Sequence, residues 1–401
     1  MPLLPVAEAR ARILANVKPL PGETVKLTDA LYRVLAAPVK AMRDQPPFDA
    51  SAMDGYAVRG ADVAKVPAVL RVIGMAAAGH GFSGKVGPGE AIRIFTGAPL
   101  PKGADTVVIQ ENTEALAPSS VTVLETARPG QNVRARGLDF ARGDVLLPVG
   151  LALNARDIGL TAAANAPFLR VRRKPRVALF ATGDELVEPG GKPRSDQIVS
   201  SNSHALTIMA RHFGAEVINL GIVRDSLAAT MRAIAKARGV DVLVTSGGAS
   251  VGEHDFVREA LKRSGVKLDF WKIAMRPGKP FMYGRRGRQH VMGLPGNPVS
   301  ALVCARLFLK PLLDTFLGLA ADEPVMEARL GAAMKANDGR QDYVRASLAL
   351  APDGGRTATP FAKQDSSMQR TFRDAHCLIV RPPHAPEAPV GTPVPILMLD
   401  F

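Results

Sequence analysis

Apolar and polar positions divide this chain into stretches with different periods. Between residues 171 and 322, short continuous apolar runs, typical of buried strands, alternate with helical patterns that end at glycine. The predicted elements are strands over 177–180, 217–223 and 240–244, and helices over 202–213 and 225–237. Such alternation favours a parallel sheet with right-handed crossovers, in which ligands bind beyond the carboxyl ends of the strands.

Residues 46–140 carry only short strand patterns separated by glycine and proline, so we expect a small β domain there. The predicted strands are 69–75, 91–95, 106–110 and 121–124. On either side, residues 1–45 and 141–170 look helical. They include a stripe of apolar residues at helical spacing near the N-terminus, a helix starting at Thr28-Asp29, and a helix over 155–164 capped by Asn154. We expect these two segments to form one helical linker domain, into which the β domain is inserted.

Residues 323–401 are rich in proline and have short apolar runs, which predict a C-terminal β domain. The expected fold class is therefore multidomain α/β. It consists of a parallel-sheet βαβ domain over 171–322, an inserted small β domain, an N-terminal helical region and a C-terminal β domain. A chain of 401 residues is long enough for about two to four such domains.

Composition narrows the classes of function. No apolar run approaches the ~20 residues of a membrane span, and the N-terminal stripe is interrupted by basic residues, unlike a signal peptide. The net charge of +14 comes with 5% aromatic residues and no nucleic-acid-binding motif, which argues against nucleic acid and suits anionic substrates. We interpret the basic run 172–176 as a solvated linker. The expected compartment is the cytoplasm.

Cysteine and histidine offer no metal site in the sequence. The two cysteines, Cys304 and Cys377, lack ligand spacing, and Cys304 lies in an apolar run that predicts a core position. The seven histidines form no metal motif, and His254 is interpreted as a solvated loop residue. This usage fits a reducing compartment without structural disulfides.

One glycine-rich segment imitates a phosphate-binding loop. Residues 79–85 read GHGFSGK, but Val86 stands where a hydroxyl side chain should follow. Gly87, Pro88 and Gly89 then oppose the helix that would hold the phosphate. We interpret the segment as a turn of the β domain.

The strongest chemical signals follow the predicted strands. The run 240–244 leads into the small residues TSGG, whose exposed backbone N–H groups can bind an anion. The acidic residues Glu185, Asp225 and Asp255 each follow or lie within a strand-end loop. Asp225 suits a helix N-cap equally well. Carboxylates in such loops suit Mg²⁺ together with substrate phosphates.

Two proline-bounded loops complete the pattern. Arg276 and Lys279 flank a Pro-Gly turn, which suits a tetrahedral oxyanion. The block GLPGNPVS places Pro295 and Pro298 in a rigid turn, in which Asn297 satisfies the turn or caps the next helix. Together these loops predict a pocket for a phosphorylated small molecule.

The blocks TSGGASVGEHD, RPGKP and LPGNPVS resemble the molybdopterin molybdenumtransferases, or molybdenum insertases. The resemblance extends upstream to SAMDGYA, TGA and TGDEL, so six blocks stand in the family's order over nearly the whole chain. It implies an enzyme of molybdenum cofactor biosynthesis that converts adenylyl-molybdopterin and molybdate to molybdenum cofactor and AMP, with Mg²⁺ as cofactor. It also implies a homodimer and an association with the pterin adenylyltransferase that supplies the substrate.

The resemblance assigns roles residue by residue. Asp54, Thr96, Glu185, Asp225 and Asp255 take catalytic positions, and Asp225 and Asp255 would hold magnesium. Asp54 and Thr96 would meet the cavity of the dimer mate. The positions for the pterin and adenylate are Thr182, Gly183, Asp184, Glu185, Ser246, Gly247, Gly248, Ser250, Gly252, Pro295 and Pro298. The positions for molybdate are Arg276, Lys279, Ser300, Arg345 and Ser366, where the serine could instead be Ser367. The family often has Lys where Arg276 stands, which leaves the role of Arg276 open.

Two other functions fit parts of the pattern. A pterin adenylyltransferase would share the βαβ domain, but it would not need the inserted and terminal β domains. A scaffold that only binds the pterin would not need the acidic and cationic positions, which are present here. The sequence leaves open which group, if any, acts as a general base.

Overall fold

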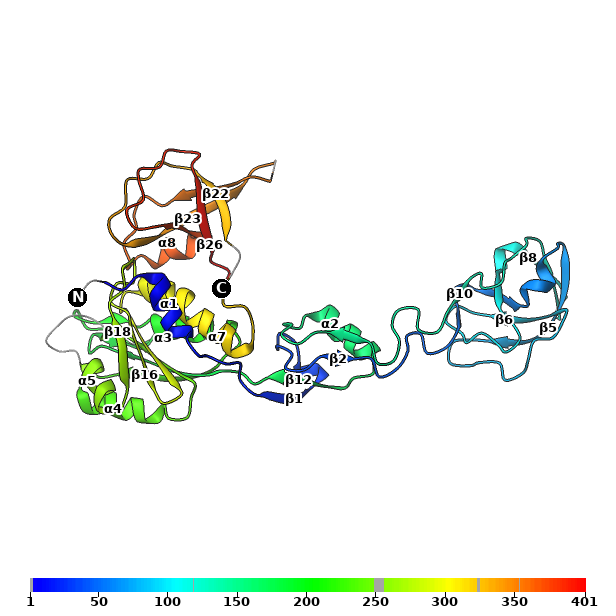
Figure 1. The fold of residues 1–401 in the computed structure, drawn as a ribbon, viewed down its shortest axis with the longest axis horizontal. Helices are drawn as coiled ribbons and strands as arrows, with labels where there is room; N and C mark the ends of the chain where they lie inside the picture. The colour runs from blue at the N-terminus through cyan, green and yellow to red at the C-terminus, as the bar shows by residue number, and fades with distance from the viewer. Residues whose placement is uncertain (1–2, 118, 249–255, 323–324, 353) are drawn as a thin grey trace. The chain divides into compact units, whose positions relative to one another are not determined.

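The computed structural model describes residues 3–117, 119–248, 256–322, 325–352 and 354–401. The chain forms two compact units (Figure 1). One, called the large unit, contains Met1–Glu23 and Arg172–Phe401, and the other, called the inserted unit, contains Thr24–Val171. The domain limits expected from the sequence are finer than this division and stay predictions. No helix in the described ranges is long and apolar enough to cross a membrane.

A six-stranded sheet forms the centre of the large unit. Its order is β16 (Glu216–Val223), β13 (Arg176–Thr182), β17 (Val242–Ser246), β21 (Gln289–Leu294), β20 (Met282–Arg286) and β18 (Lys267–Trp271). The first four strands are parallel, as predicted, whereas β20 and β18 continue the sheet in the antiparallel direction. The sequence did not predict this antiparallel edge.

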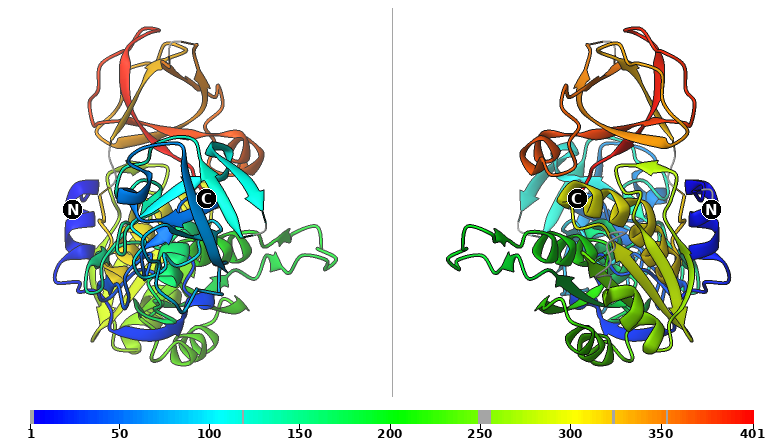
Figure 2. Two further views of the ribbon diagram at one scale, coloured as in Figure 1. Left: turned by 90° about the vertical axis from the view of Figure 1, so that its right-hand side faces the viewer. Right: turned by 90° about the vertical axis from the view of Figure 1, so that its left-hand side faces the viewer.

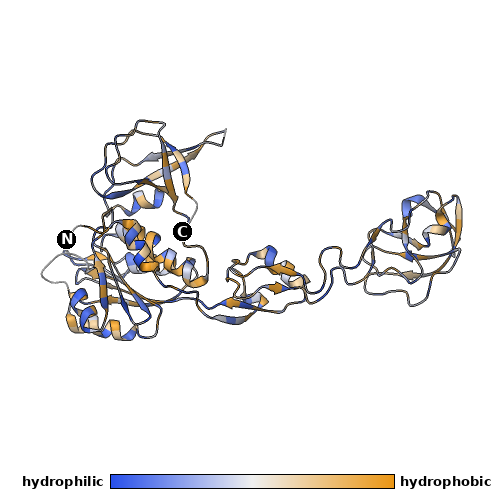
Figure 3. Cartoon of the chain, in the orientation of Figure 1, coloured by the Kyte–Doolittle hydropathy of each residue, from blue (hydrophilic) through white to orange (hydrophobic). Residues whose placement is uncertain are grey.

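Alternating residues of the sheet face two cores. Val177 and Leu179 of β13 belong to one core, whereas Ala178 and Phe180 belong to the other, because successive side chains of a strand point to opposite faces. The helices are α1 (Val6–Leu14), α3 (Asn202–His212), α4 (Leu227–Lys236), α5 (Phe256–Arg263), α6 (Pro298–Cys304) and α7 (Lys310–Leu317), with a π-helical turn at Ala305–Leu309. Apolar residues dominate the strands of this sheet (Figure 3). Cys304 is fully buried in the first core, which confirms its predicted position.

The C-terminal part of the large unit is a closed β structure. The strands β22 (Met326–Leu330), β23 (Gln341–Leu350), β24 (Arg356–Pro360), β25 (Cys377–Arg381) and β26 (Pro393–Met398) close on themselves, because β23 pairs with both β24 and β25. The short strand β19 (Met275–Arg276) adds to β23 in parallel, and α8 (Gln369–Asp374) follows a loop from β24. This pairing fixes the RPGKP loop against the C-terminal barrel.

The inserted unit contains the predicted β domain. Its sheet has the order β7 (Thr106–Ile109), β4 (Gly55–Val58), β6 (Glu90–Ile94), β5 (Ala68–Ala76), β9 (Ser120–Val123) and β8 (Thr113–Ala117). The four predicted strands all occur. The GHGFSGK segment forms a turn closed by a bridge between Ala77 and His80, with no helix after it, as the interpretation required.

The predicted helical linker is helical only in part. The chain between 22 and 51 and between 133 and 172 forms short strands: β1 (Gly22–Lys26), β2 (Val39–Lys40), β3 (Ala50–Ser51), β10 (Val133–Arg134), β11 (Val145–Leu147) and β12 (Phe168–Arg172). The prediction of a helix from Thr28 is wrong, because Leu27–Asp29 makes a single 3-10 turn, as do Gly60–Val63 and Gln110–Asn112 elsewhere in this unit. The helix α2 (Ala155–Ala163) confirms the other prediction. Asn154 Oδ1 accepts from Arg156 N at 2.8 Å and completes a capping box with Asp157.

The basic run 172–176 lies where the two units join, and it is less solvated than predicted. Arg173 makes a two-pronged ion pair with Asp241, with nitrogen–oxygen distances of 2.7 and 2.8 Å. The backbone N–H of Arg176 donates to the same carboxylate at 2.8 Å. Asp241 therefore ties the start of β13 to the start of β17, and the run has a structural role.

Candidate functional site

A cavity of about 1060 Å³ opens at the carboxyl ends of the parallel strands of the large unit. β13 and β17 are paired so that Ala181 lies opposite Ser246, and Ser246 lies opposite Leu294 of β21. The three strands therefore deliver their following loops to one edge, as the fold type predicts. The predicted site residues that line the cavity are Thr182, Gly183, Glu185, Asp225, Ser246, Gly247, Gly248, Arg276, Lys279, Pro295, Pro298, Ser300 and Ser366.

Two glycines let the chain turn tightly after β17. Gly247 has φ +90°, and a Cβ there would stand 2.4 Å from the carbonyl oxygen of Thr182. Gly248 has φ +63°, and a Cβ there would stand 2.3 Å from Cγ2 of Val257. Only glycine fits both the backbone angle and the space. The loop is thus close-packed against β13 and α5, with its backbone at the cavity.

Thr182 and Asp225 connect two strand ends across the cavity edge. The Thr182 hydroxyl donates to Asp225 Oδ1 at 2.7 Å, and the backbone N–H of Asp225 donates to Asp184 Oδ1 at 3.2 Å. Asp225 does not cap α4, because Ser226 does so by accepting from the backbone N–H of Ala229. The carboxylate of Asp225 is therefore available at the cavity. Asp184 is exposed but does not line the cavity.

Asn202, which the sequence analysis did not single out, joins two of the site loops. Its side-chain nitrogen donates to Ser246 Oγ at 2.9 Å and to the carbonyl oxygen of Gly296 at 2.7 Å. Both partners line the cavity, as does Asn202 itself. Little in the sequence singled out Asn202, because a polar residue at the start of a predicted helix usually serves only to begin that helix. Asn202 sets the distance between the TSGG and LPGN loops.

The walls of the cavity next to Glu185 come from an excursion of the chain that projects from the α/β sheet (Figure 2). The short strands β14 (Leu186–Val187) and β15 (Ile198–Val199) pair in parallel within it. Leu186, Ile198 and Val199 line the cavity and give it an apolar wall. Such a wall suits the flat face of a heteroaromatic ring.

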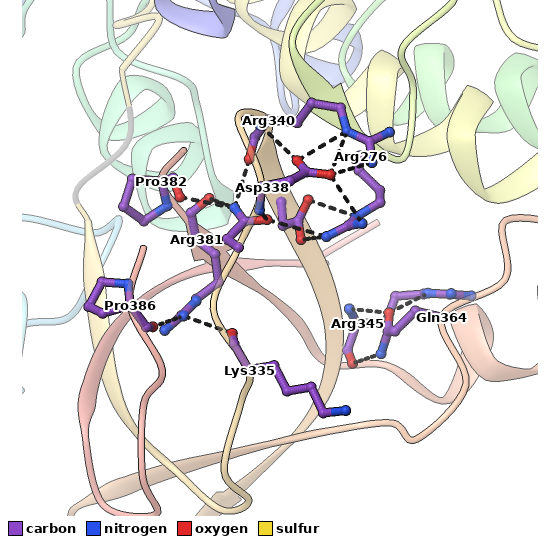
Figure 4. A network of polar contacts seen from close by, with 11 residues as sticks. Arg276, Lys335, Asp338, Arg340, Arg345, Gln364, Arg381, Pro382 and Pro386 are labelled. Atoms are coloured by element: carbon purple, nitrogen blue, oxygen red, sulfur yellow. Dashed lines mark hydrogen bonds and ion pairs between the residues drawn. The ribbon is translucent and has the colours of Figure 1, made fainter. Parts of the chain in front are cut away.

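Three basic residues also line the cavity. Arg276, Lys279 and Arg340 all line it, and Arg340 was not among the predicted site residues. Arg276 makes a two-pronged pair with Asp342, with Nε 2.9 Å from Oδ1 and Nη2 close to Oδ2 (Figure 4). The side chain of Lys279 is exposed and has no ion pair among the described residues. Lys279 thus keeps its charge available to an anion.

Arg345, one of the predicted molybdate residues, lies behind the cavity wall. It is 1% exposed and does not line the cavity. Its backbone N and Nε donate to Gln364 Oε1 at 3.0 and 3.1 Å, and Gln364 Nε2 donates back to the carbonyl oxygen of Arg345 at 3.0 Å (Figure 4). Gln364 itself lines the cavity. Burial lowers the pKa of the Arg345 guanidinium, although Asp365 opposes that effect.

Ser366 comes from the C-terminal part and contacts the α/β part of the same unit. Asn297 Nδ2 donates to Ser366 Oγ at 2.7 Å, and the backbone N–H of Val299 donates to the carbonyl oxygen of Ser366 at 3.0 Å. Asn297 makes no side-chain cap to α6, so its amide serves this contact instead. Ser300, on α6, is 4% exposed and lines the cavity, as does Ser367.

Asp54 and Thr96 lie together in the inserted unit. The backbone N–H and the hydroxyl of Thr96 donate to Asp54 Oδ1 at 2.7 and 2.8 Å. These bonds lower the pKa of the exposed Asp54 carboxyl, so that it stays ionised. The two residues, 42 positions apart in sequence, therefore form one polar group.

Part of the predicted site cannot be compared with the structure. Ser250, Gly252 and Asp255, together with His254, lie outside the described residues. Among the residues that are described, no group of three or more His, Cys, Asp or Glu side chains is arranged to hold a metal ion. Asp225 is the described member of the expected magnesium pair.

Comparisons with known proteins cover nearly the whole chain. Residues 4–165 match the family described as the MoeA N-terminal region (domain I and II). Residues 178–315 match a probable molybdopterin binding domain, and residues 327–399 match the MoeA C-terminal region (domain IV).

Individual relatives agree with these matches. A molybdopterin molybdenumtransferase of Nostoc sp. is 39% identical over 362 residues, which are 86% of this chain and 83% of the relative. One of Haemophilus influenzae is 35% identical over 383 residues, 94% of each chain. A crystal structure of a molybdopterin biosynthesis moeA protein from Pyrococcus horikosii superposes with a TM-score of 0.87 at 31% identity, covering 100% of both chains.

Proposed function

This chain belongs to the molybdopterin molybdenumtransferase family, and on that premise we propose that it transfers molybdenum from molybdate to adenylyl-molybdopterin, giving molybdenum cofactor and AMP. One observation carries the proposal beyond family membership. A single cavity of about 1060 Å³ is lined both by the glycine backbone at the strand ends and by the basic residues Arg276, Lys279 and Arg340. That volume lies at the upper end of small-molecule sites, which suits a dinucleotide-sized substrate with an added oxyanion.

The pterin and its adenylate occupy the strand-end side in this proposal. Gly247 and Gly248 present backbone there, and Thr182, Gly183, Glu185 and Ser246 surround them. Backbone N–H groups at a strand-to-loop junction bind phosphate without a side-chain charge. The carboxylate of Asp184 accepts from the backbone N–H of Asp225 and so holds it beside this part of the cavity. Pro295 and Pro298 hold the facing loop rigid.

Molybdate occupies the cationic side. Lys279 supplies an uncompensated charge, whereas Ser300 and Ser366 supply hydroxyl groups at the cavity wall. A tetrahedral dianion taken from water needs several charge-assisted donors of this kind. Arg345 acts through Gln364, which it orients from behind the wall. Arg345 is therefore a positioning residue in this account.

The residues at the strand ends fit a magnesium ion bound with the substrate. Mg²⁺ commonly takes one or two carboxylates together with substrate phosphates, and Asp225 offers an exposed carboxylate beside the proposed phosphate site. Asp225, together with Asp255 from outside the described residues, would hold the ion. Bound there, magnesium would neutralise charge as the adenylate bond breaks.

The protein's own groups mainly position the reactants. Asn202 holds the TSGG and LPGN loops at a fixed separation, and the Asn297–Ser366 bond holds the C-terminal part against them. Fixing two reactants in one geometry converts a bimolecular step into an effectively intramolecular one. The family reaction needs such an arrangement, because molybdate must be held next to the pterin dithiolene.

The assembly is also part of the proposal. We place Asp54 and Thr96 of a partner subunit at the cavity of a homodimer, because the two residues form one exposed, ionised group and the family resemblance assigns both to the site. The pterin adenylyltransferase, as the source of the substrate, is the expected cytoplasmic partner.

A comparison of two substrate mixtures tests the proposed reaction against its alternative. The protein is incubated with adenylyl-molybdopterin, magnesium and molybdate, and separately with molybdopterin, ATP and magnesium. We expect AMP and molybdenum cofactor from the first mixture only. Adenylyl-molybdopterin formation in the second mixture would identify an adenylyltransferase, and binding without turnover in either would identify a scaffold.

A further inference from the structure

Arg340 lines the cavity with its guanidinium already engaged. Its Nη2 lies 2.6 Å from Asp338 Oδ2, and its Nε lies 3.2 Å from both oxygens of that carboxylate (Figure 4). Asp338 thus meets the planar edge of Arg340 in the fork geometry by which arginine binds a carboxylate or another oxyanion.

A second arginine of the cavity shares the same carboxylate. Arg276 Nη1 lies 3.7 Å from Asp338 Oδ2, while its other face is paired with Asp342. We call Arg276, Asp338, Arg340 and Asp342 the arginine–aspartate cluster. Its two positive charges are matched by two negative charges, so the cluster presents no net charge to the cavity.

The turn that carries Asp338 is fixed to the barrel. Asn337 Nδ2 donates to the carbonyl oxygens of Arg340 at 2.7 Å and Pro382 at 2.9 Å. The backbone N–H of Arg340 donates to Asp338 Oδ1 at 2.9 Å. The backbone of Asp338 is held separately, because its N–H donates to Asn337 Oδ1 at 2.9 Å and its carbonyl oxygen accepts from the backbone N–H of His384 at 2.8 Å. Its side chain, 47% exposed, can therefore turn away from the Arg340 guanidinium without unfolding the turn.

The Asp338 carboxylate stays ionised throughout the neutral pH range. The bonds from the Arg340 side chain and backbone lower the pKa of Asp338 to about 2. The same contact raises the pKa of Arg340. The pair is exposed enough for water and ions to compete with it, and pairs of this kind are weak.

We propose that Asp338 is an internal competitor for the oxyanion site: it occupies the fork of Arg340 until a tetrahedral oxyanion displaces it. This deepens the proposed function by naming Asp338 and Arg340 as the residues that set the affinity and selectivity for the oxyanion. A weakly held or singly charged anion fails to displace the carboxylate, whereas a dianion gains both Lys279 and the released Arg340. The competing carboxylate thereby raises the concentration at which other cellular anions would occupy the site.

Direct binding of inorganic oxyanions tests this without the pterin. Isothermal titration calorimetry at low ionic strength measures the affinity for molybdate and for sulfate. It compares the wild-type chain with Asp338→Asn, Arg340→Ala and the double variant. Asparagine keeps an oxygen for the backbone N–H of Arg340 but removes the charge. We expect Asp338→Asn to bind both tetrahedral dianions, molybdate and sulfate, about fivefold more tightly.

The double variant assigns the gain to Arg340. Arg340→Ala alone should weaken molybdate binding by about fivefold, because the anion loses a donor and Asp338 loses its main partner, and it should abolish the gain in the Asp338→Asn background. Glu259→Gln is the matched control. Glu259 is 46% exposed and pairs with Arg263 at 2.6 Å on α5, but it does not line the cavity, so its loss should leave binding unchanged.

Three results would overturn the proposal. They are unchanged or weaker oxyanion binding by an Asp338→Asn protein with wild-type thermal stability, a gain that survives loss of Arg340, and wild-type oxyanion affinity in Arg340→Ala alone. Because the probe is the inorganic anion, a chain that releases no AMP can still show the gain, and a chain that releases AMP can lack it. Failure of this proposal is thus separable from failure of the proposed reaction.

Discussion

At the residue scale, the contacts of Asp225 explain why we expect its carboxylate to affect AMP release. The Thr182 hydroxyl orients its carboxylate, and the neighbouring Ser226, rather than Asp225, caps α4. Asp225→Asn should therefore leave the helix intact but remove one charge beside a phosphate. We expect AMP release at limiting magnesium to fall by about thirtyfold, an effect of about 2 kcal/mol.

The control for Asp225 is Thr182→Val, which removes only the orienting bond. Its loss of rate should be smaller, because the carboxylate charge remains. Initial rates of AMP release across a magnesium titration provide the measurement. Wild-type rates for Asp225→Asn at limiting magnesium would reject the metal assignment.

The environment of Lys279 leads us to a second prediction, which concerns molybdate binding. Lys279 lines the cavity and is exposed, and no described carboxylate pairs with it, in contrast to Arg276 and Arg340. Lys279→Gln should raise the molybdate concentration for half-maximal activity by about tenfold, with little change in binding of adenylyl-molybdopterin. Lys236→Gln, at the end of α4 and outside the cavity, is the control and should change neither value. Weaker pterin binding with a normal molybdate requirement would show that the two ends of the cavity were interchanged.

The sequence predicted the residue types of the site better than their contacts. Strand ends and the proline turn pointed to the loops that carry Ser246 and Lys279, and the family resemblance assigned Thr182 and Ser246 individually. Asn202 and Gln364 were missed, since their amides act on loops that are distant in sequence. Such partners become visible only when the chain has folded, because nothing local marks them.

At the scale of elements, a buried histidine joins β21 to β20 and α1. His290 Nδ1 lies 2.9 Å from the Tyr283 hydroxyl, which donates to the carbonyl oxygen of Ile13 at 3.3 Å, and Arg285 Nη2 lies 3.0 Å from Nε2. Burial lowers the pKa of His290 to about 4, and Arg285 adds to that effect. The neutral ring therefore holds three elements together.

This arrangement predicts a loss of stability on acidification. Because the pKa of His290 is lower in the folded chain, its contribution is complete above about pH 6.5 and is lost as pH falls through 4. The full effect is about 3 kcal/mol. Thermal melts of wild type and His290→Gln between pH 7 and pH 4 measure it, and the difference between the two proteins should shrink steadily over that interval. A difference that is constant with pH would show that His290 does not titrate in this way.

The periodic pattern of the chain was a good guide to regular elements and a poor one elsewhere. The βαβ elements over 177–244 were predicted because their apolar runs are long and end at glycine. The segment after Thr28 failed, since a capping residue without a following apolar stripe gave only a 3-10 turn. The antiparallel β20 and β18 were not predicted, because a short apolar run does not reveal strand direction.

At the scale of the whole molecule, the account requires two subunits for each complete site. Asp54→Ala and Asp225→Asn chains should each have strongly reduced activity as homodimers at limiting magnesium. In a heterodimer of the two, one cavity retains both Asp225 and the Asp54 of the partner subunit, so about one site of two should work. Mixing the denatured variants and refolding them together, followed by an AMP assay, measures this. Activity no higher than that of either parent would mean that Asp54 serves its own subunit, and an active monomer in sedimentation would exclude the dimer altogether.

The dependence of AMP release on molybdate tests the central claim most directly. Purified protein is incubated with adenylyl-molybdopterin and magnesium while molybdate is varied from zero to saturation, and AMP and molybdenum cofactor are quantified in the same samples. The account predicts that both products rise together with molybdate, in equal amounts. Adenylate cleavage that is independent of molybdate, or consumption of the substrate without any molybdenum cofactor, would contradict it.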